Sequence, residues 1–120
     1  MIDNTWATAI YFNPFDFGVD IVIEAITKYI SGHSDIMMGV VLGNNEDLIA
    51  LQRWSKNTGN YVSPDDIYMS LRGLRTLPLR LKKSSQNSLE IAKFLETKNI
   101  IKKVFHPALE QDERLFLLCF

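Results

Sequence analysis

The feature that most constrains the fold is a run of largely β-branched residues, DIVIEAI, at positions 20–26. Such a short, nearly continuous apolar run is typical of a strand buried on both faces of a sheet, as in α/β proteins. Residues 37–42 (MMGVVL) form a second run of this kind, and residues 2–10 are a shorter, aromatic-rich one. Breakers such as Asn13-Pro14 separate these runs. The first half therefore predicts several short strands joined by tight loops.

The second half predicts helices. Asn45 can cap a first helix, and Ser63-Pro64-Asp65-Asp66 is a helix start with serine as N-cap and proline at the first helical position. We expect Pro78 to break or kink the helix that begins there. A further helix is expected over residues 84–97, followed by a strand over residues 100–105.

The composition is that of an ordinary globular domain. With 120 residues, 47% of them hydrophobic and 22% charged, the chain has the length of one domain and no bias toward disorder. Its one cysteine, Cys119, excludes an intrachain disulfide and a cysteine-rich zinc site. The apolar run at residues 115–120 is too short to span a bilayer, and the N-terminus lacks the pattern of a signal peptide. We therefore expect a cytoplasmic protein.

Charge is divided unevenly along the chain. Residues 1–52 carry seven acidic side chains and a single basic one, Lys28, whereas residues 53–107 carry eleven basic and four acidic ones. The basic residues fall on helix-like stretches, where charged side chains usually lie on solvated faces. Nucleic-acid binding is therefore disfavoured, and the solitary lysine is the more informative feature.

Three residues are candidates for chemistry. Lys28 closely follows the DIVIEAI run, where an amine can act as a Schiff-base nucleophile; alternatively it points into water. Asp3 lies in a short apolar segment, where a buried carboxylate needs a partner; alternatively it caps the following turn. His33 is either an acid or base or a local hydrogen-bonding residue, and with Asp35 alone it is too sparse for a metal site.

Two motifs stand out, DNTWA at residues 3–7 and TKYISGHSD at residues 27–35. They resemble the Asp-Asn-Thr strand and the lysine segment of the trans-sulfuration family of pyridoxal-phosphate-dependent enzymes. Residues 70–77 (SLRGLRTL) and 105–109 (FHPAL) continue the similarity, which covers about residues 2–109. The resemblance implies an α/β fold, namely part of the large domain of a fold-type-I pyridoxal-phosphate enzyme.

The resemblance also implies roles for individual residues. Lys28 would form a Schiff base with pyridoxal 5'-phosphate and then move the Cα proton of the substrate. Asp3 would pair with the protonated pyridine nitrogen, and the Thr27 hydroxyl would donate to the cofactor phosphate. Trp6 and Ala25 are most like the cystathionine beta-lyase branch, which implies a carbon–sulfur lyase that converts cystathionine to homocysteine, pyruvate and ammonia. A gamma-lyase or gamma-synthase is the alternative within the family.

The resemblance divides the chain into three parts. Residues 1–80 would belong to the cofactor-binding large domain, residues 81–109 would be the linking helix and first strand of the small domain, and residues 110–120 form a divergent tail. Other site residues of the family, including a glycine-rich phosphate loop and an arginine for the substrate carboxylate, fall outside this sequence. Both ends are also abrupt, so we expect an internal piece that a homo-oligomer or a complementing chain completes. The alternative is a truncated, non-catalytic remnant.

Overall fold

The computed structural model describes residues 1–109, and of Asn45 only the backbone. These residues form two compact units, one of Met1–Pro78 and one that begins at Leu79. The assignment of residues 1–80 and 81–109 to a large and a small domain stays a prediction, and the tail at 110–120 lies outside the described residues. Each unit has a small apolar core, made of Val22, Ile26, Ile36 and Leu77 in the first and Leu81, Ala92 and Leu109 in the second.

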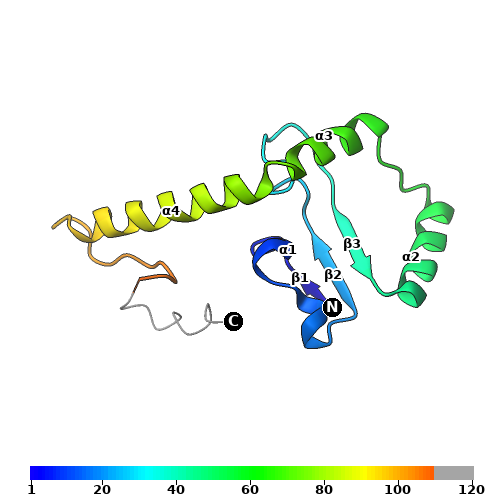
Figure 1. Ribbon diagram of the computed structural model, residues 1–120, viewed down its shortest axis with the longest axis horizontal. Coiled ribbons are helices and arrows are strands. Elements are labelled where there is room, and N and C mark those ends of the chain that lie inside the picture. Colours follow the sequence, from blue (N-terminus) through cyan, green and yellow to red (C-terminus); the bar gives the residue numbers. More distant parts are fainter. Residues whose placement is uncertain (110–120) are drawn as a thin grey trace. The chain divides into compact units, whose positions relative to one another are not determined.

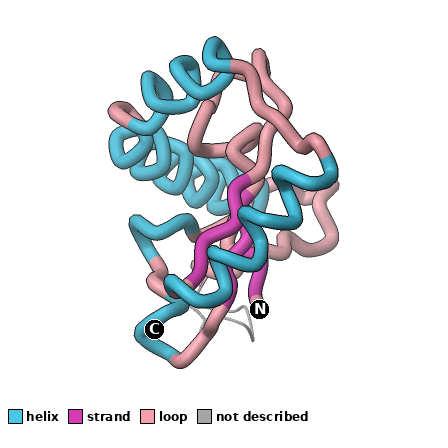
Figure 2. Tube along the Cα trace, turned by 90° about the vertical axis from the view of Figure 1, so that its right-hand side faces the viewer, coloured by secondary structure: helices cyan, strands magenta, loops and turns pink. Residues whose placement is uncertain are grey.

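The first unit contains a three-stranded sheet, made of β1 (Ile2–Asp3), β2 (Ile21–Glu24) and β3 (Val40–Gly43), with β2 in the middle (Figure 1). β1 runs parallel to β2 and β3 runs antiparallel to it, so the sheet is mixed. The strands lie side by side in a second view as well (Figure 2). The α/β class expected from the sequence is therefore confirmed.

The first predicted strand is much shorter than expected. β1 ends at Asp3, and the chain then turns into a short helix, α1 (Thr8–Tyr11), and a 3-10 helix over Pro14–Phe17. The side chain of Asn4 explains the turn, because its amide donates to the carbonyl of Phe12 at 3.1 Å and folds the segment back on itself. The aromatic residues of the segment lie in these helices and loops instead of in a strand.

Two helices of the first unit begin at side-chain caps. α2 (Asn45–Thr58) is capped by Asn44, whose side-chain oxygen accepts from the N–H of Asp47 at 3.1 Å. α3 (Pro64–Leu74) is capped by Ser63, as predicted, with Oγ accepting from the N–H of Asp66 at 3.0 Å. The predicted cap at Asn45 is wrong by one residue, because Asn44 has the extended backbone that an N-cap requires and Asn45 is already helical.

The last helix begins earlier than the sequence suggested. α4 spans Leu77–Glu96, and Pro78 is its second residue, where the missing N–H of proline is not needed. Pro78 therefore does not break a helix; the break falls between Leu74 and Leu77. The strand expected over residues 100–105 is not formed, because no strand among the described residues pairs with this segment. Within residues 1–109, no helix combines the length and the apolar character needed to cross a membrane.

Candidate active site

The sheet brings two of the candidate residues to the same edge. Asp3 is the last residue of β1, and Lys28 lies in the turn that follows β2. Because β1 and β2 are parallel neighbours, their carboxyl ends lie at one edge of the sheet. This edge is where ligands of open α/β sheets bind.

Thr5 fixes the carboxylate of Asp3. A hydrogen bond from the Thr5 side chain, together with one from its backbone N–H to Oδ1 at 2.8 Å, holds the pKa of Asp3 below its ordinary value of 3.8. The side chain of Asp3 is exposed, so it is the turn-capping carboxylate of the two alternatives and not the buried one. Asp3 is therefore ionised at neutral pH and available to a cation.

Ala25 connects this carboxylate to the lysine segment. Its N–H donates to the Thr5 hydroxyl oxygen at 2.8 Å, and its carbonyl accepts from the N–H of Lys28 at 3.0 Å. The Lys28 carbonyl in turn accepts from the N–H of Gly32 at 3.0 Å, which closes the turn. The side chain of Lys28 is exposed, so its amine lies at the surface of the described residues, above a backbone that is firmly held.

Thr27 fastens the lysine turn to the segment that leads into β3. Its hydroxyl accepts from the N–H of Met38 at 2.8 Å and lies 3.1 Å from the Met38 carbonyl, to which it donates. The Thr27 N–H also donates to that carbonyl, at 3.1 Å. A hydroxyl has one proton, so donation from Thr27 to a phosphate requires that proton to turn away from Met38.

Gly73 of α3 packs directly against the backbone that follows Lys28. A Cβ placed on Gly73 would lie 2.5 Å from the carbonyl oxygen of Ser31 and 2.8 Å from its Cα, and closer still to the carbonyl oxygen of Ile30. Only glycine leaves room for this approach. The sequence motif at residues 70–77 therefore has a physical role, which is to seat α3 on the lysine turn.

His33 is held by the same turn. Its Nδ1 lies 2.6 Å from the carbonyl oxygen of Ser31, and since a carbonyl only accepts, Nδ1 carries the proton. In the neutral ring, Nε2 is then the acceptor, so this exposed side chain retains the capacity of a base. Among the described residues no group of three or more His, Cys, Asp or Glu side chains could hold a metal ion.

The sequence reasoning missed a buried carboxylate at the end of β2. Glu24 is 3% exposed, and its Oε1 accepts from Nδ2 of Asn4 at 3.2 Å. Burial raises the pKa of Glu24 above its ordinary 4.5, against the hydrogen bond from Asn4; the charge of Asp3 raises it further, and a hydrogen bond from the N–H of Ala9 lowers it. Strand alternation was the available signal, because Glu24 shares a face with the buried Val22.

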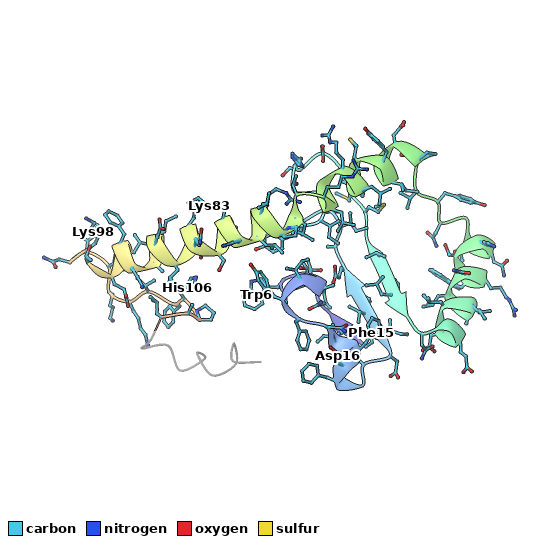
Figure 3. The ribbon with its side chains drawn as sticks, in the orientation of Figure 1. Trp6, Phe15, Asp16, Lys83, Lys98 and His106 are labelled. Carbon is cyan, nitrogen blue, oxygen red and sulfur yellow. The ribbon has the colours of Figure 1, made fainter. Side chains whose placement is uncertain are left out.

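Trp6 and Ala25, the residues that indicated a branch of the family, have different environments. Trp6 is 66% exposed and projects from the segment after β1 (Figure 3). Ala25 is partly buried, and its backbone is the connection between Thr5 and Lys28 described above. The side chain at Ala25 offers no hydroxyl to a ligand, so the position contributes through its backbone alone.

The second unit holds a serine–histidine pair that the sequence did not suggest. Nε2 of His106 lies 2.8 Å from Oγ of Ser88, and its Nδ1 accepts from the N–H of Ala108 at 3.2 Å. The neutral ring therefore carries its proton on Nε2 and donates it to the serine. A serine nucleophile needs the opposite arrangement, with the histidine accepting, so the pair serves to fasten α4 to the loop that follows.

Sequence comparisons place this geometry in a known context. The family profile of the Cys/Met metabolism PLP-dependent enzymes matches residues 1–117. A Rhizobium johnstonii protein provisionally named cystathionine beta-lyase is 51% identical over 109 residues, which are 91% of this chain and 28% of that protein. The L-alanine/L-glutamate racemase of Wolbachia pipientis is 45% identical over 107 residues, 89% of this chain and 27% of the racemase. The chain thus spans less than a third of the length of these relatives.

Comparison with solved structures indicates the same family. The fold superposes with a TM-score of 0.92 on cystathionine gamma synthase from Xanthomonas oryzae in complex with aminoacrylate and cysteine, at 36% sequence identity. The match covers 98% of this chain and 30% of that enzyme. Family profile, relatives and superposition agree. The chain belongs to the family of PLP-dependent enzymes of Cys/Met metabolism.

Proposed function

We propose that this chain carries the lysine half of a pyridoxal-phosphate site, with Lys28, Asp3 and Thr27 as the residues that hold the cofactor. The supporting observation is the edge of the sheet itself, where the ends of β1 and β2 are joined through Thr5 and Ala25. These three side chains fit pyridoxal phosphate. Lys28 offers an exposed amine that can bond covalently to an aldehyde, Asp3 offers a carboxylate kept ionised to face a pyridinium, and Thr27 offers a hydroxyl.

Each residue has a distinct task in this proposal. Lys28 would hold the cofactor through its Nζ; once the substrate amine has displaced that Nζ, the free amine would accept the Cα proton of the substrate and return a proton as a general acid. Asp3 keeps a proton on the pyridine nitrogen, because its low pKa leaves it negatively charged. When bound, pyridoxal phosphate supplies an electron sink for the electron pair left at Cα. Thr27 donates to the phosphate after its proton turns away from Met38.

For the whole protein we propose a carbon–sulfur lyase of the cystathionine beta-lyase type, which converts cystathionine to homocysteine, pyruvate and ammonia. The name of the Rhizobium relative and the residues Trp6 and Ala25 support this choice. A gamma-lyase or gamma-synthase activity is the alternative, supported by the Xanthomonas structure. A role in methionine biosynthesis and a cytoplasmic location belong to the same proposal.

The remaining parts of the site must come from outside these 120 residues, because the chain spans less than a third of its relatives. We propose that a complementing chain supplies the phosphate loop and the group that binds the substrate carboxylate, in an assembly with one or more copies of this chain. The competing hypothesis is a non-catalytic remnant, in which the motif survives without a pocket.

An absorbance titration with pyridoxal phosphate, followed by borohydride trapping and peptide mapping, tests cofactor binding. Wild type should gain a visible absorbance band and a label on Lys28, whereas Lys28→Ala should show neither. Lys56→Ala, at an exposed position of α2, is the matched control and should behave as wild type. Labelling of Lys28 no stronger than that of other surface lysines would favour the remnant hypothesis.

A product assay separates the possible reactions. With the complementing chain present, cystathionine should yield pyruvate and homocysteine if the beta-lyase proposal is correct. Formation of cysteine and an oxobutanoate would indicate gamma-elimination instead. Conversion of L-alanine to D-alanine would indicate the chemistry named for the Wolbachia relative.

A further inference from the structure

Glu24 is a buried ionisable group that the proposed chemistry does not use. Its side chain is 3% exposed and lies on the same face of β2 as Val22, which is 1% exposed. Such a residue needs hydrogen-bond partners, and Glu24 has them in the amide of Asn4 and the N–H of Ala9. Both partners belong to the segment that follows β1, so Glu24 ties the end of β2 to the segment that carries Asp3.

Every N–H group of Asn4 donates a hydrogen bond. Its Nδ2 donates to Oε1 of Glu24 at 3.2 Å and to the carbonyl of Phe12 at 3.1 Å, which uses both amide protons. Its backbone N–H donates to the carbonyl of Ile23 at 2.8 Å. Asn4 itself is 4% exposed, so this network is closed to solvent. The residue directly after Asp3 is therefore fixed at both its backbone and its side chain.

Two hydrogen bonds join the segments at the ends of β1 and β2, and each segment contributes two consecutive residues. Glu24 accepts from Asn4, and the next residue, Ala25, donates to the next residue, Thr5, at 2.8 Å. Thr5 in turn binds the carboxylate of Asp3. Loss of the first contact loosens Asn4, which lies between Asp3 and Thr5, and so changes the direction of the carboxylate.

We propose that Glu24 is a positioning residue, which acts through Asn4 to aim the Asp3 carboxylate at the ring nitrogen of the cofactor. This inference rests on the proposed function for the identity of the ligand. Asp3 touches the cofactor and Glu24 does not, so Glu24 controls the geometry of one contact and leaves the covalent contact at Lys28 unchanged.

A pair of probes isolates that one contact. Pyridoxal phosphate and its 1-deaza analogue, in which carbon replaces the ring nitrogen, differ only in the atom that Asp3 faces. The wild-type chain should bind pyridoxal phosphate more tightly than the analogue. Glu24→Ala should reduce this preference by about tenfold or more, as expected for a misplaced charged contact. Glu24→Gln retains an acceptor for Asn4 and should preserve the preference.

A merely structural role gives a different result. If Glu24 only supported the fold, Glu24→Ala would weaken binding of both probes equally and leave their ratio unchanged, which would overturn the proposal. Loss of the preference in a folded Glu24→Gln chain would also overturn it, because the acceptor oxygen is still present. Glu90→Gln, an exposed glutamate of α4, is the matched control.

Hydrogen exchange tests the positioning without any cofactor. In Glu24→Ala, the amides of Thr5 and Ala25 should exchange about tenfold faster or more, while those of α2 keep the wild-type rate. Should this variant unfold, Glu24→Asp takes its place, because it keeps the carboxyl group but withdraws the oxygens by about 1.5 Å; the same faster exchange is expected. Wild-type exchange at both amides overturns the proposal. Failure of wild type to bind pyridoxal phosphate would instead count against the proposed function.

Discussion

Gly73→Ala tests whether α3 positions the lysine turn. The added Cβ would lie 2.5 Å from the carbonyl oxygen of Ser31 and 2.8 Å from its Cα, whereas ordinary contact begins at 3.4 Å. The three nearest atoms are all backbone atoms, so the clash cannot be relieved by rotating a side chain. Relief requires α3 and the turn to separate by roughly 1 Å, a distance that is not tolerated in a close-packed interior without cost.

Two opposing effects determine how much Gly73→Ala changes the free energy of unfolding. Overpacking of this kind costs about 1–3 kcal/mol, and contact with three backbone atoms places Gly73→Ala toward the upper end. Alanine recovers at most about 1 kcal/mol of helix propensity, and less here, because Gly73 is the last residue but one of α3. The free energy of unfolding should therefore fall by about 2 kcal/mol. A displacement near 1 Å at Lys28 should also lower the rate of a reaction at its amine by up to about a hundredfold.

Urea denaturation and the rate of borohydride trapping at Lys28 measure the two effects. Gly39→Ala is the matched control, because its Cβ would meet only the carbonyl oxygen of Glu24, at an ordinary 3.7 Å. That variant should lie within about 0.5 kcal/mol of wild type. The reasoning is refuted if Gly73→Ala is as stable as Gly39→Ala and traps the cofactor at the same rate.

Three further changes have defined outcomes. Ser63→Ala removes the cap of α3 and should lower the free energy of unfolding by about 1 kcal/mol in urea denaturation. The raised pKa of Glu24 keeps it protonated in the folded chain after the unfolded chain has released the proton, so stability falls as pH rises above 4.5; Glu24→Gln should flatten that part of the thermal stability profile. The lowered pKa of Asp3 makes stability fall as pH drops below 3.8, and Asp3→Asn should flatten that part; because the charge of Asp3 helps to raise the pKa of Glu24, it should also weaken the dependence above pH 4.5. A Glu24→Gln chain that lost the dependence below pH 3.8 but kept that above pH 4.5 would contradict these assignments.

Local signals in the sequence predicted much of the fold. Ser63-Pro64 determined the start of α3 because a cap and a proline act on their immediate neighbours. The run at residues 20–26 located β2 because β-branched apolar residues favour a strand, but the expected burial on both faces is wrong, since only alternate residues of β2, Val22 and Glu24, are buried. The strand expected over residues 100–105 failed because a strand also needs a partner, which the sequence of the segment does not contain.

The residues of the candidate site also fall into those that local motifs predicted and those that only the fold shows. The motifs were enough to select Asp3, Thr27 and Lys28, whose roles in the chemistry stay predictions. They could not show that Gly73 lies against the lysine turn, because this contact joins residues more than forty positions apart. Nor could they show that Glu24 is buried with Asn4, since a glutamate in a strand is usually solvated. Contacts between distant residues depend on the fold and not on any local pattern.

These distant contacts also bear on the choice between an active segment and a remnant. In a chain that has lost its function, the residues that position others are no longer required to fit. Here Gly73 still leaves space for the lysine turn, and Glu24 still binds Asn4. Thr5 still connects Asp3 with the backbone that leads to Lys28. An active segment requires such supports and a remnant does not, so measuring how firmly they hold is more decisive than searching for the motif.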